Sequence, residues 1–258
     1  MKGISGKNVI VTAGGSGIGL GIALGYQSLG ANVTVCDVDG TSLAALSKAH
    51  PSLTAVKADI SDEEQVTHLF ETAIDKMGSI DILVNNAGIS GPTSPLENIS
   101  LADWRSCMSV NIDGCFLCCR QVVPFLKDQG GGSIINISST AGILAYPMRA
   151  PYAASKWAMI GLTKTLAMEL GPFGIRTNSI APGSINNSRM DGVIARESIA
   201  KGVSEEEIRE SYERQSAMGS FIDVEEIADM AIFLSSDLGK NINGQVIAVD
   251  GFAETITT

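Results

Sequence analysis

Histidine is nearly absent from this sequence. Only His50 and His68 occur among the 258 residues. The first precedes Pro51 at a predicted helix end and the second lies in a charged helical stretch, so both are expected at the surface. Neither an HExxH motif nor a Cys/His zinc site can be written, and a Ser-His-Asp triad has no well-placed base. We therefore expect no metal site, and any acid–base catalysis must use other side chains.

Basic residues are also few. Lysine and arginine total 18 against 28 aspartates and glutamates, which gives a formal net charge of -10. Nucleic acid is an unfavourable main partner, because phosphate binding depends on clustered cations. The acidity is concentrated late in the chain: residues 1–183 hold 12 basic and 14 acidic side chains, and residues 184–258 hold 6 and 14. An anionic substrate would therefore need a local cation.

No long apolar run is uninterrupted. Residues 8–36 carry no charge and follow two lysines, as in a signal peptide or membrane anchor, but seven glycines break the stretch. A spanning helix or signal sequence would be continuous. We expect a strand, a turn and a helix here, with no membrane partner and a cytoplasmic location. The five cysteines, an odd number, are then expected as reduced, buried thiols.

Strand-like and helix-like segments alternate along the chain. Short Val- and Ile-rich runs, apolar on both faces, predict a mostly parallel sheet covered by helices on each side. The expected fold class is α/β: a single-domain, doubly wound Rossmann fold with a seven-stranded sheet over residues 1–258. The predicted strands cover residues 8–12, 32–36, 53–57, 82–85, 133–138, 176–181 and 245–249.

Two other segments carry local predictions. A helix is expected over residues 61–77, where Ser61 and Glu64 match a capping box. The charged segment at about 184–215 follows the sixth strand and is expected to form a helical flap. Ligands of such sheets bind at the carboxyl ends of the strands, so this flap is a candidate substrate cover.

A glycine-rich turn follows the first predicted strand and leads into a helix. The N–H groups and positive dipole end of a helix N-terminus suit a pyrophosphate. The strict GxGxxG pattern is absent, because Ile22 stands where the third glycine would be. The candidate cofactor-binding residues in this turn are Gly14, Gly15, Ser16, Gly17 and Ile18.

Asp37 strengthens the prediction of a nucleotide. It ends the second strand about 18 residues after the turn, where an acidic side chain accepts both ribose hydroxyls and repels a 2′-phosphate. No Lys or Arg stands in the turn or directly after Asp37. NAD is therefore the predicted cofactor, in preference to NADP. The alternative is that Asp37 is a helix cap or a turn residue.

Tyr152 and Lys156 are the candidate chemical groups. They follow Pro151, which suits a first helical turn, and their spacing of four places both on one helix face. A tyrosine with a pKa of about 10 needs a downward shift of roughly three units, about 4 kcal/mol, to act as a base near neutral pH. A neighbouring lysine cation and an oxidised nicotinamide ring, which is also positive, are suitable groups to stabilise the phenolate and so lower this pKa. Ser139, ending the fifth strand, either holds the substrate oxygen or is a strand-end turn residue.

These residues resemble the short-chain dehydrogenase/reductase family over essentially the full chain. The matching motifs, in the family's order, are the glycine-rich turn at 12–19, Asp59-Ile60, Asn85-Asn86-Ala87-Gly88, Asn111, Ser139, Tyr152 with Lys156, and Pro182-Gly183. The resemblance implies that Tyr152 is the general acid/base, that Lys156 lowers its pKa and holds the nicotinamide ribose, and that Ser139 orients the substrate oxygen. Asn111 would shape a kink in a long helix and hold a water in a proton relay.

The resemblance also implies cofactor contacts and an assembly. Asp59 and Ile60 would contact the adenine, and Asn86 with its neighbours the adenine-side ribose and central sheet. Pro182 and Gly183 would face the nicotinamide. Gly88 and Ile185 complete the expected cofactor-binding set. A homotetramer, or a dimer, is expected.

Two positions depart from the family pattern. Ala13 stands at the family's first glycine, so we expect a negative φ there, with Gly14 absorbing the turn. The threonine that usually binds the nicotinamide amide is replaced by Asn187 or, with a one-residue insertion, by Ser188. The sequence leaves both open.

The predicted function is NAD-dependent interconversion of a secondary alcohol and a ketone in a small polar metabolite such as a sugar, polyol or hydroxy acid. Arg189 either binds a substrate anion or pairs with Asp191 or Glu197. The alternatives are a 3-oxoacyl-type ketone reductase, a non-catalytic NAD(H) sensor or scaffold, and a nucleotide-sugar epimerase. Such an epimerase normally needs a longer C-terminal part.

Overall fold

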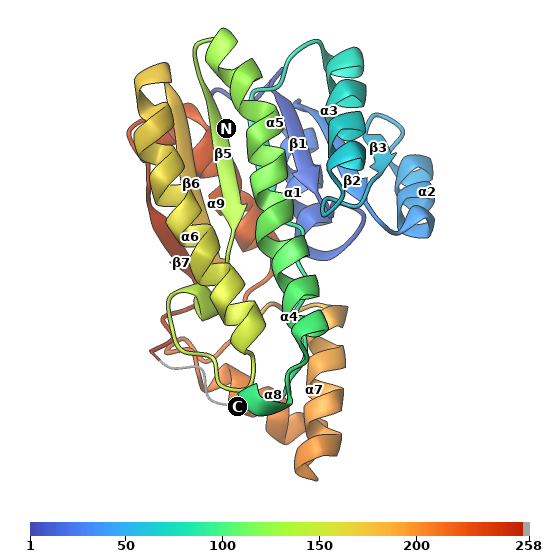
Figure 1. Cartoon of the computed structure of the whole chain (residues 1–258), viewed down its shortest axis with the longest axis vertical. Helices are drawn as coiled ribbons and strands as arrows, with labels where there is room; N and C mark the ends of the chain where they lie inside the picture. The colour runs from blue at the N-terminus through green and yellow to red at the C-terminus, as the bar shows by residue number, and fades with distance from the viewer. Residues whose placement is uncertain (255–258) are drawn as a thin grey trace.

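The protein forms one parallel sheet between two layers of helices (Figure 1). The computed structural model describes residues 1–254, apart from the side chains of residues 188, 189 and 200. The seven strands lie in the order β3-β2-β1-β4-β5-β6-β7, and every neighbouring pair is parallel. They are β1 (Asn8–Thr12), β2 (Asn32–Asp37), β3 (Thr54–Lys57), β4 (Ile82–Asn85), β5 (Gly132–Ile137), β6 (Ile175–Pro182) and β7 (Val246–Val249).

The strand predictions are confirmed to within one residue at each end. The central strands are apolar and buried along almost their whole length, as expected for a sheet covered on both faces. The helices between them are α1 (Gly17–Ser28), α2 (Gly40–Ala49), α3 (Glu63–Met77), α4 (Leu101–Met108), α5 (Gly114–Asp128), α6 (Ala150–Leu170), α7 (Ser188–Lys201), α8 (Glu205–Glu213) and α9 (Val224–Ser235).

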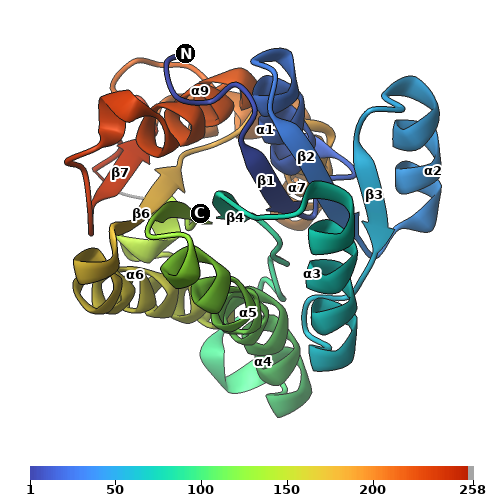
Figure 2. The same cartoon turned by 90° about the horizontal axis from the view of Figure 1, so that it is seen from above.

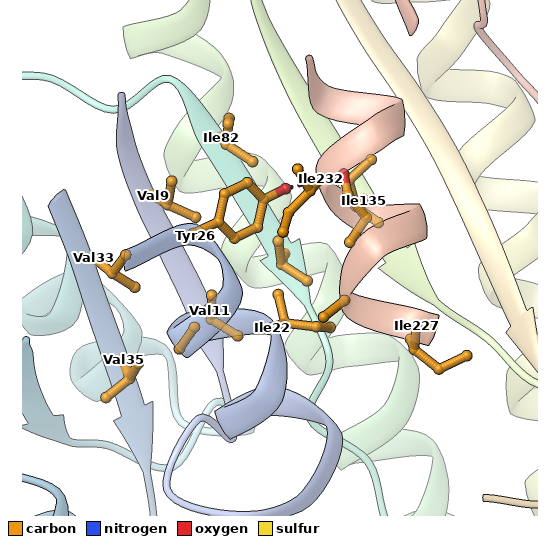
Figure 3. Packing of buried hydrophobic residues seen from close by; sticks show 14 of the residues in the cluster. Val9, Val11, Ile22, Tyr26, Val33, Val35, Ile82, Ile135, Ile227 and Ile232 are labelled. Atoms are coloured by element: carbon orange, nitrogen blue, oxygen red, sulfur yellow. Dashed lines mark hydrogen bonds between the residues drawn. The ribbon is translucent and has the colours of Figure 1, made fainter. Parts of the chain in front are cut away.

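Alternate side chains of the strands build two cores. Helices α1, α2 and α9 pack on one face of the sheet, and α3, α5 and α6 pack on the other (Figure 2). In the first core, Tyr26 of α1 is fully buried between the sheet and α9, near Val9 and Ile232 (Figure 3). Its hydroxyl donates to the Ala231 carbonyl at 3.0 Å, so the buried phenol is satisfied.

Strand order fixes where a ligand can bind. The chain winds outward from β1 to β3, then returns to β4 on the other side of β1. The helical connections after β1 and β4 therefore leave in opposite directions, which opens a crevice at the carboxyl ends of these strands.

The start of α3 differs from the prediction. The helix begins at Glu63, and its cap is Asp62, whose carboxylate accepts the N–H groups of Glu64 and Gln65 at 3.0 and 3.1 Å. The expected Ser61–Glu64 capping box is wrong. Both the N–H and the hydroxyl of Ser61 donate to Asp59 Oδ1, at 2.9 and 2.7 Å, so Ser61 belongs to the turn before the helix.

The segment after β6 forms two helices, α7 and α8, as its charge pattern predicts. They lie beyond one end of the sheet (Figure 1) and share a small apolar cluster of Ile194, Ile208 and Tyr212. A capping box of Ser204 and Glu207 starts α8. These two helices are therefore held together by apolar contacts of their own.

The cysteine side chains are all buried and unbridged, as expected. Burial raises the pKa of the Cys36 thiol to about 12. The residues with free thiols are Cys36, Cys107, Cys115, Cys118 and Cys119. Across the described residues 1–254, no helix combines the length and apolarity that crossing a bilayer requires.

Candidate active site

A cavity of about 600 Å³ opens at the carboxyl ends of the strands. Residues following each strand line it, together with side chains of α7 and α8. Most of the predicted site residues meet here: Ser16, Gly17, Ile18, Asp37, Asp59, Ile60, Asn86, Gly88, Ser139, Tyr152, Lys156, Pro182, Gly183 and Ile185. Gly14, Gly15 and Asn111 are not among the residues that line it.

The glycine-rich turn places a bare helix end at the cavity. Ser16 is the N-cap of α1, its side chain caps no backbone group, and the first helical turn has no acidic residue. A side chain at Gly19 would overlap the Ala13 carbonyl oxygen, so the turn closes tightly only with glycine there. Asn86 fixes the turn from β4, donating to the carbonyls of Thr12 and Ala13 at 3.0 and 3.2 Å. This amide contact was not foreseen from the sequence.

Ala13 overturns one prediction. Its φ is +50°, in the left-handed region, and not negative. Gly14 does not absorb the turn; instead a Cβ at Gly14 would lie 2.7 Å from the Val35 Cβ, so glycine permits close contact with β2. The left-handed conformation costs a residue with a side chain roughly 1–2 kcal/mol. The turn therefore carries backbone strain at Ala13.

Asp37 lies beside the turn at the end of β2. Its Oδ2 accepts the Gly15 N–H at 3.1 Å, and its Oδ1 accepts the Asp39 N–H at 3.1 Å. The second contact is a turn contact, which was the alternative for this residue, but the cap of α2 is Asp39. Each carboxylate oxygen has further acceptor capacity toward the cavity. Val38, which follows, is 60% exposed and carries no charge.

Tyr152 and Lys156 stand on the first turns of α6, and Ser139 faces them from the end of β5. The Lys156 ammonium is buried, donates to the Ile137 carbonyl at 2.8 Å and lies 5.7 Å from the centre of the Tyr152 ring. The Ser139 hydroxyl accepts the Ala141 N–H at 3.1 Å. The phenol, the ammonium and the serine hydroxyl thus belong to residues that line the same cavity.

Asn111 lies in a π-helical stretch, Ser109–Asp113, between α4 and α5. Its buried amide is held on both sides: Oδ1 accepts the Ile89 N–H at 2.8 Å, and Nδ2 donates to the Ile89 carbonyl at 3.0 Å and to Ser155 Oγ at 2.9 Å. A Cβ at Gly88 would lie 3.2 Å from Asn111 Oδ1 and 3.4 Å from Lys156 Nζ. Glycine at this position therefore lets the amide and the ammonium both lie close to the backbone of residue 88.

The adenine-side and nicotinamide-side candidates are held by local contacts. Asp59 accepts from Ser61, as described, and Ile60 packs closely against Gly114 of α5. Gly183 stands where a Cβ would lie 2.8 Å from the Asp250 Cβ, so β6 and the chain after β7 approach closely. Ile185 is buried and bridges to Ile222.

Asn187 caps α7 by accepting the Met190 N–H at 3.0 Å. The side chains of Ser188 and Arg189 lie outside the described residues. The two acidic residues weighed as partners of Arg189 have contacts elsewhere: Asp191 pairs with Arg209, and Glu197 pairs with Lys201 at 3.3 Å.

Three cavity side chains were given no individual role from the sequence, although Tyr212 lies in the predicted flap. Arg149 is only 5% exposed and lies just before α6. Tyr146 meets the Tyr152 ring edge-on at 6.4 Å between centroids. The Tyr212 hydroxyl of α8 donates to Glu197 Oε1 at 2.7 Å, and burial raises the pKa of Tyr212. Only the placement of Arg149 three residues before Tyr152 offered a signal. Within residues 1–254, side chains that are described form no group of three His, Cys, Asp or Glu suited to a metal.

Known proteins are similar along nearly the whole chain. A family model described as Enoyl-(Acyl carrier protein) reductase matches residues 12–251. The 3-oxoacyl-(acyl-carrier-protein) reductase FabG of Thermotoga maritima is 36% identical over 253 residues, which covers 96% of this chain and 98% of that protein.

Solved structures agree. The crystal structure of levodione reductase superposes with a TM-score of 0.89 at 31% identity, covering 96% of this chain and 97% of the other. The 3-ketoacyl-(acyl-carrier-protein) reductase from Brucella melitensis, complexed with NADH, gives 0.87 at 30% identity, covering 96% and 98%.

Proposed function

Because the chain belongs to the short-chain dehydrogenase/reductase family, we propose that it interconverts a secondary alcohol and a ketone in a small polar metabolite, with NAD as the cofactor. The observation that carries this proposal is the shared cavity of Ser139, Tyr152 and Lys156 with the glycine-rich turn and Asp37. A carbinol, a nicotinamide and a proton-transfer group can meet only where these parts adjoin.

The residues present fit a dinucleotide. Ser16, Gly17 and Ile18 offer the uncapped start of α1 for the pyrophosphate, where a helix dipole favours negative charge. Asp37 offers its carboxylate to the adenine-side ribose hydroxyls. Among the described lining residues near Asp37 there is no Lys or Arg to accept a 2′-phosphate, which supports NAD over NADP.

Other lining residues would hold the remaining parts of the cofactor. Asp59 and Ile60 would contact the adenine, and Asn86 and Gly88 would contact the adenine-side ribose. At the far side, Lys156 would hold the nicotinamide ribose. The nicotinamide would be faced by Pro182, Gly183 and Ile185, with Asn187 or Ser188 at the usual threonine position.

The chain's own groups would move the proton. A bound nicotinamide would supply the acceptor or donor of a hydride for the carbinol carbon. Ser139 would hold the substrate oxygen by a hydrogen bond. In oxidation the Tyr152 phenolate would receive the proton of the alcohol, and in reduction the Tyr152 phenol would donate it to the oxygen of the ketone. The nearby Lys156 ammonium stabilises the phenolate by its charge. Asn111, fixed to Ile89 and Ser155, would hold a relay water near Lys156.

The helices α7 and α8 would cover the substrate. Met190, Val193 and Tyr212 line the cavity from this side. A cover that excludes water strengthens the electrostatic interactions inside a site. Residues 184–215 are therefore proposed as a flap over the substrate end, within one domain of residues 1–258.

Assembly and location are also proposals. Large apolar side chains of α5 and α6 are exposed, with Phe116 at 46%, Trp157 at 52% and Met168 at 81%. Such a surface suits contact with further copies of the chain, as a homotetramer or a dimer. The buried, unbridged thiols support a reducing, cytoplasmic location.

Two other functions remain as outcomes of one experiment. The test is a panel of secondary alcohols and ketones with NAD and with NADP, followed by nicotinamide absorbance. Turnover of small polar substrates with NAD supports the proposal. A preference for 3-oxoacyl thioesters would favour the acyl-reductase alternative, which the Thermotoga relative supports. Binding of NADH with no turnover across the panel would contradict the enzyme proposal and favour a sensor.

A further inference from the structure

Arg149 is a buried cation at the substrate end of the cavity. Its side chain belongs to the cavity lining, although the residue is only 5% exposed. No Asp or Glu in the described part of the chain forms an ion pair with it. A charge removed from water is costly unless an opposite charge or hydrogen bonds replace the water. The missing partner is therefore a feature that needs a cause.

The donors of Arg149 are only partly used. A guanidinium carries five N–H donors. Nη2 donates to the Ser90 carbonyl at 3.0 Å, whereas Nε is buried and has no acceptor among the described residues. A buried donor without an acceptor is rare in native proteins, because it loses its hydrogen bonds to water and gains no other hydrogen bond in return. The guanidinium thus retains capacity for a planar acceptor such as a carboxylate.

Two aromatic rings hold the Arg149 guanidinium in position. The guanidinium carbon is 5.2 Å from the centre of the Tyr146 ring and 5.6 Å from that of Tyr152. These two cation–π contacts hold the guanidinium in place without neutralising its charge. The site is also at the beginning of α6, whose first turn has no acidic residue, so the helix dipole adds positive potential. The cation is held beside the residue that receives the proton.

Other cations do not compete for this role. Among the described lining residues, the only other one is Lys156, whose ammonium is bound to Ile137 and is assigned to the cofactor ribose. We propose that Arg149 binds a carboxylate of the substrate, so that the substrate is a hydroxy acid or the matching oxo acid. This inference rests on the proposed function and selects one substrate class from it.

The direct test compares acids with their own primary amides. An amide has the shape of the carboxylate but no charge. The probes are 2-hydroxybutanoate, 3-hydroxybutanoate and 4-hydroxypentanoate, each against its amide, because the series varies the reach from carbinol to anion. For at least one pair, the wild-type protein should show kcat/KM about 10- to 100-fold higher for the acid, the range of a hydrogen bond to a charged group.

Three variants separate binding from a structural role. Arg149→Met should remove the preference for the acid, chiefly through KM. Arg149→Lys keeps the charge but loses the planar fork, so it should keep part of the preference. Arg189→Ala is the matched control, because Arg189 is the other cation that the sequence suggested for binding a substrate anion. Thermal unfolding and NADH fluorescence confirm that each variant is folded and binds cofactor.

The outcomes are distinct. Equal losses of kcat/KM on acid and amide in Arg149→Met, or a shifted pH profile with an unchanged preference, would overturn the proposal and make Arg149 a positioning residue for Tyr152. Loss of the preference in Arg189→Ala alone would also overturn it. If no alcohol is turned over, quenching of bound NADH fluorescence by acid and amide still reads the site: tighter acid binding that Arg149→Met abolishes supports the anion site even though the proposed reaction fails.

Discussion

The strained residue of the glycine-rich turn gives the sharpest prediction about stability. At φ +50°, the methyl group of Ala13 is in a conformation that costs roughly 1–2 kcal/mol. Ala13→Gly removes that cost, but it gives the unfolded chain freedom equivalent to about 0.4–1 kcal/mol. The net result is a gain of about 0.5–1 kcal/mol in the free energy of unfolding.

The matched control is the same substitution in a helix. Ala45 is exposed in the middle of α2, where glycine costs about 1 kcal/mol relative to alanine. Ala45→Gly should therefore destabilise the protein while Ala13→Gly stabilises it. The two variants should differ by about 1.5–2 kcal/mol, which exceeds the uncertainty of a comparison at a common slope.

The assay is urea unfolding without cofactor, followed by the fluorescence of Trp104 and Trp157. Cofactor is omitted because ligand binding adds to the apparent stability. Protein concentration is kept constant, since association of subunits would add as well. If Ala13→Gly destabilises the protein as much as Ala45→Gly does, the left-handed conformation is not a source of strain and the reasoning fails.

Two further predictions concern the cofactor and the thiols. Asp37→Asn removes the charge near the ribose, so the ratio of kcat/KM with NAD to that with NADP should fall at least about 10-fold; an unchanged ratio would show that Asp37 is only a turn residue. At pH 8, DTNB should label none of the thiols in the folded protein and all five in denaturant. The pKa of Cys36 is raised to about 12 by burial, so its contribution to stability is complete below about pH 8.5 and declines as the pH rises toward 12. Rapid labelling of the folded protein would contradict the buried assignment.

The sheet was predictable because its signal is local. Each strand is a short run of mostly apolar residues. A run such as that of β4, apolar on both faces, is typical of a strand buried in a parallel sheet. The convergence of Tyr152, Ser139 and Asp37 at one cavity followed from the same rule, since parallel strands bring their carboxyl ends to one edge. Motifs far apart in the chain could therefore be placed at one site from the order of the strands and helices alone.

Other features depend on which of several possible partners a residue contacts in the fold, and the sequence did not predict them. Ser61 matched a capping pattern, but its hydroxyl donates a hydrogen bond to Asp59, and Asp62 caps the helix instead. Ala13 takes a positive φ in a turn that Asn86, far along the chain, holds by donating a hydrogen bond to the Ala13 carbonyl oxygen. Arg149 has no sequence signal of burial; its environment arises only when Ser90 and two aromatic rings fold around it.

We propose above all that Tyr152 transfers the proton in a site that also binds NAD. Its most direct test is Tyr152→Phe, measured with the best alcohol from the panel by nicotinamide absorbance, alongside NADH binding by fluorescence. We expect turnover to fall by about 100- to 10,000-fold, the usual contribution of a general acid–base group, while NADH still binds. Retention of most of the turnover by the folded, NADH-binding variant would contradict the account.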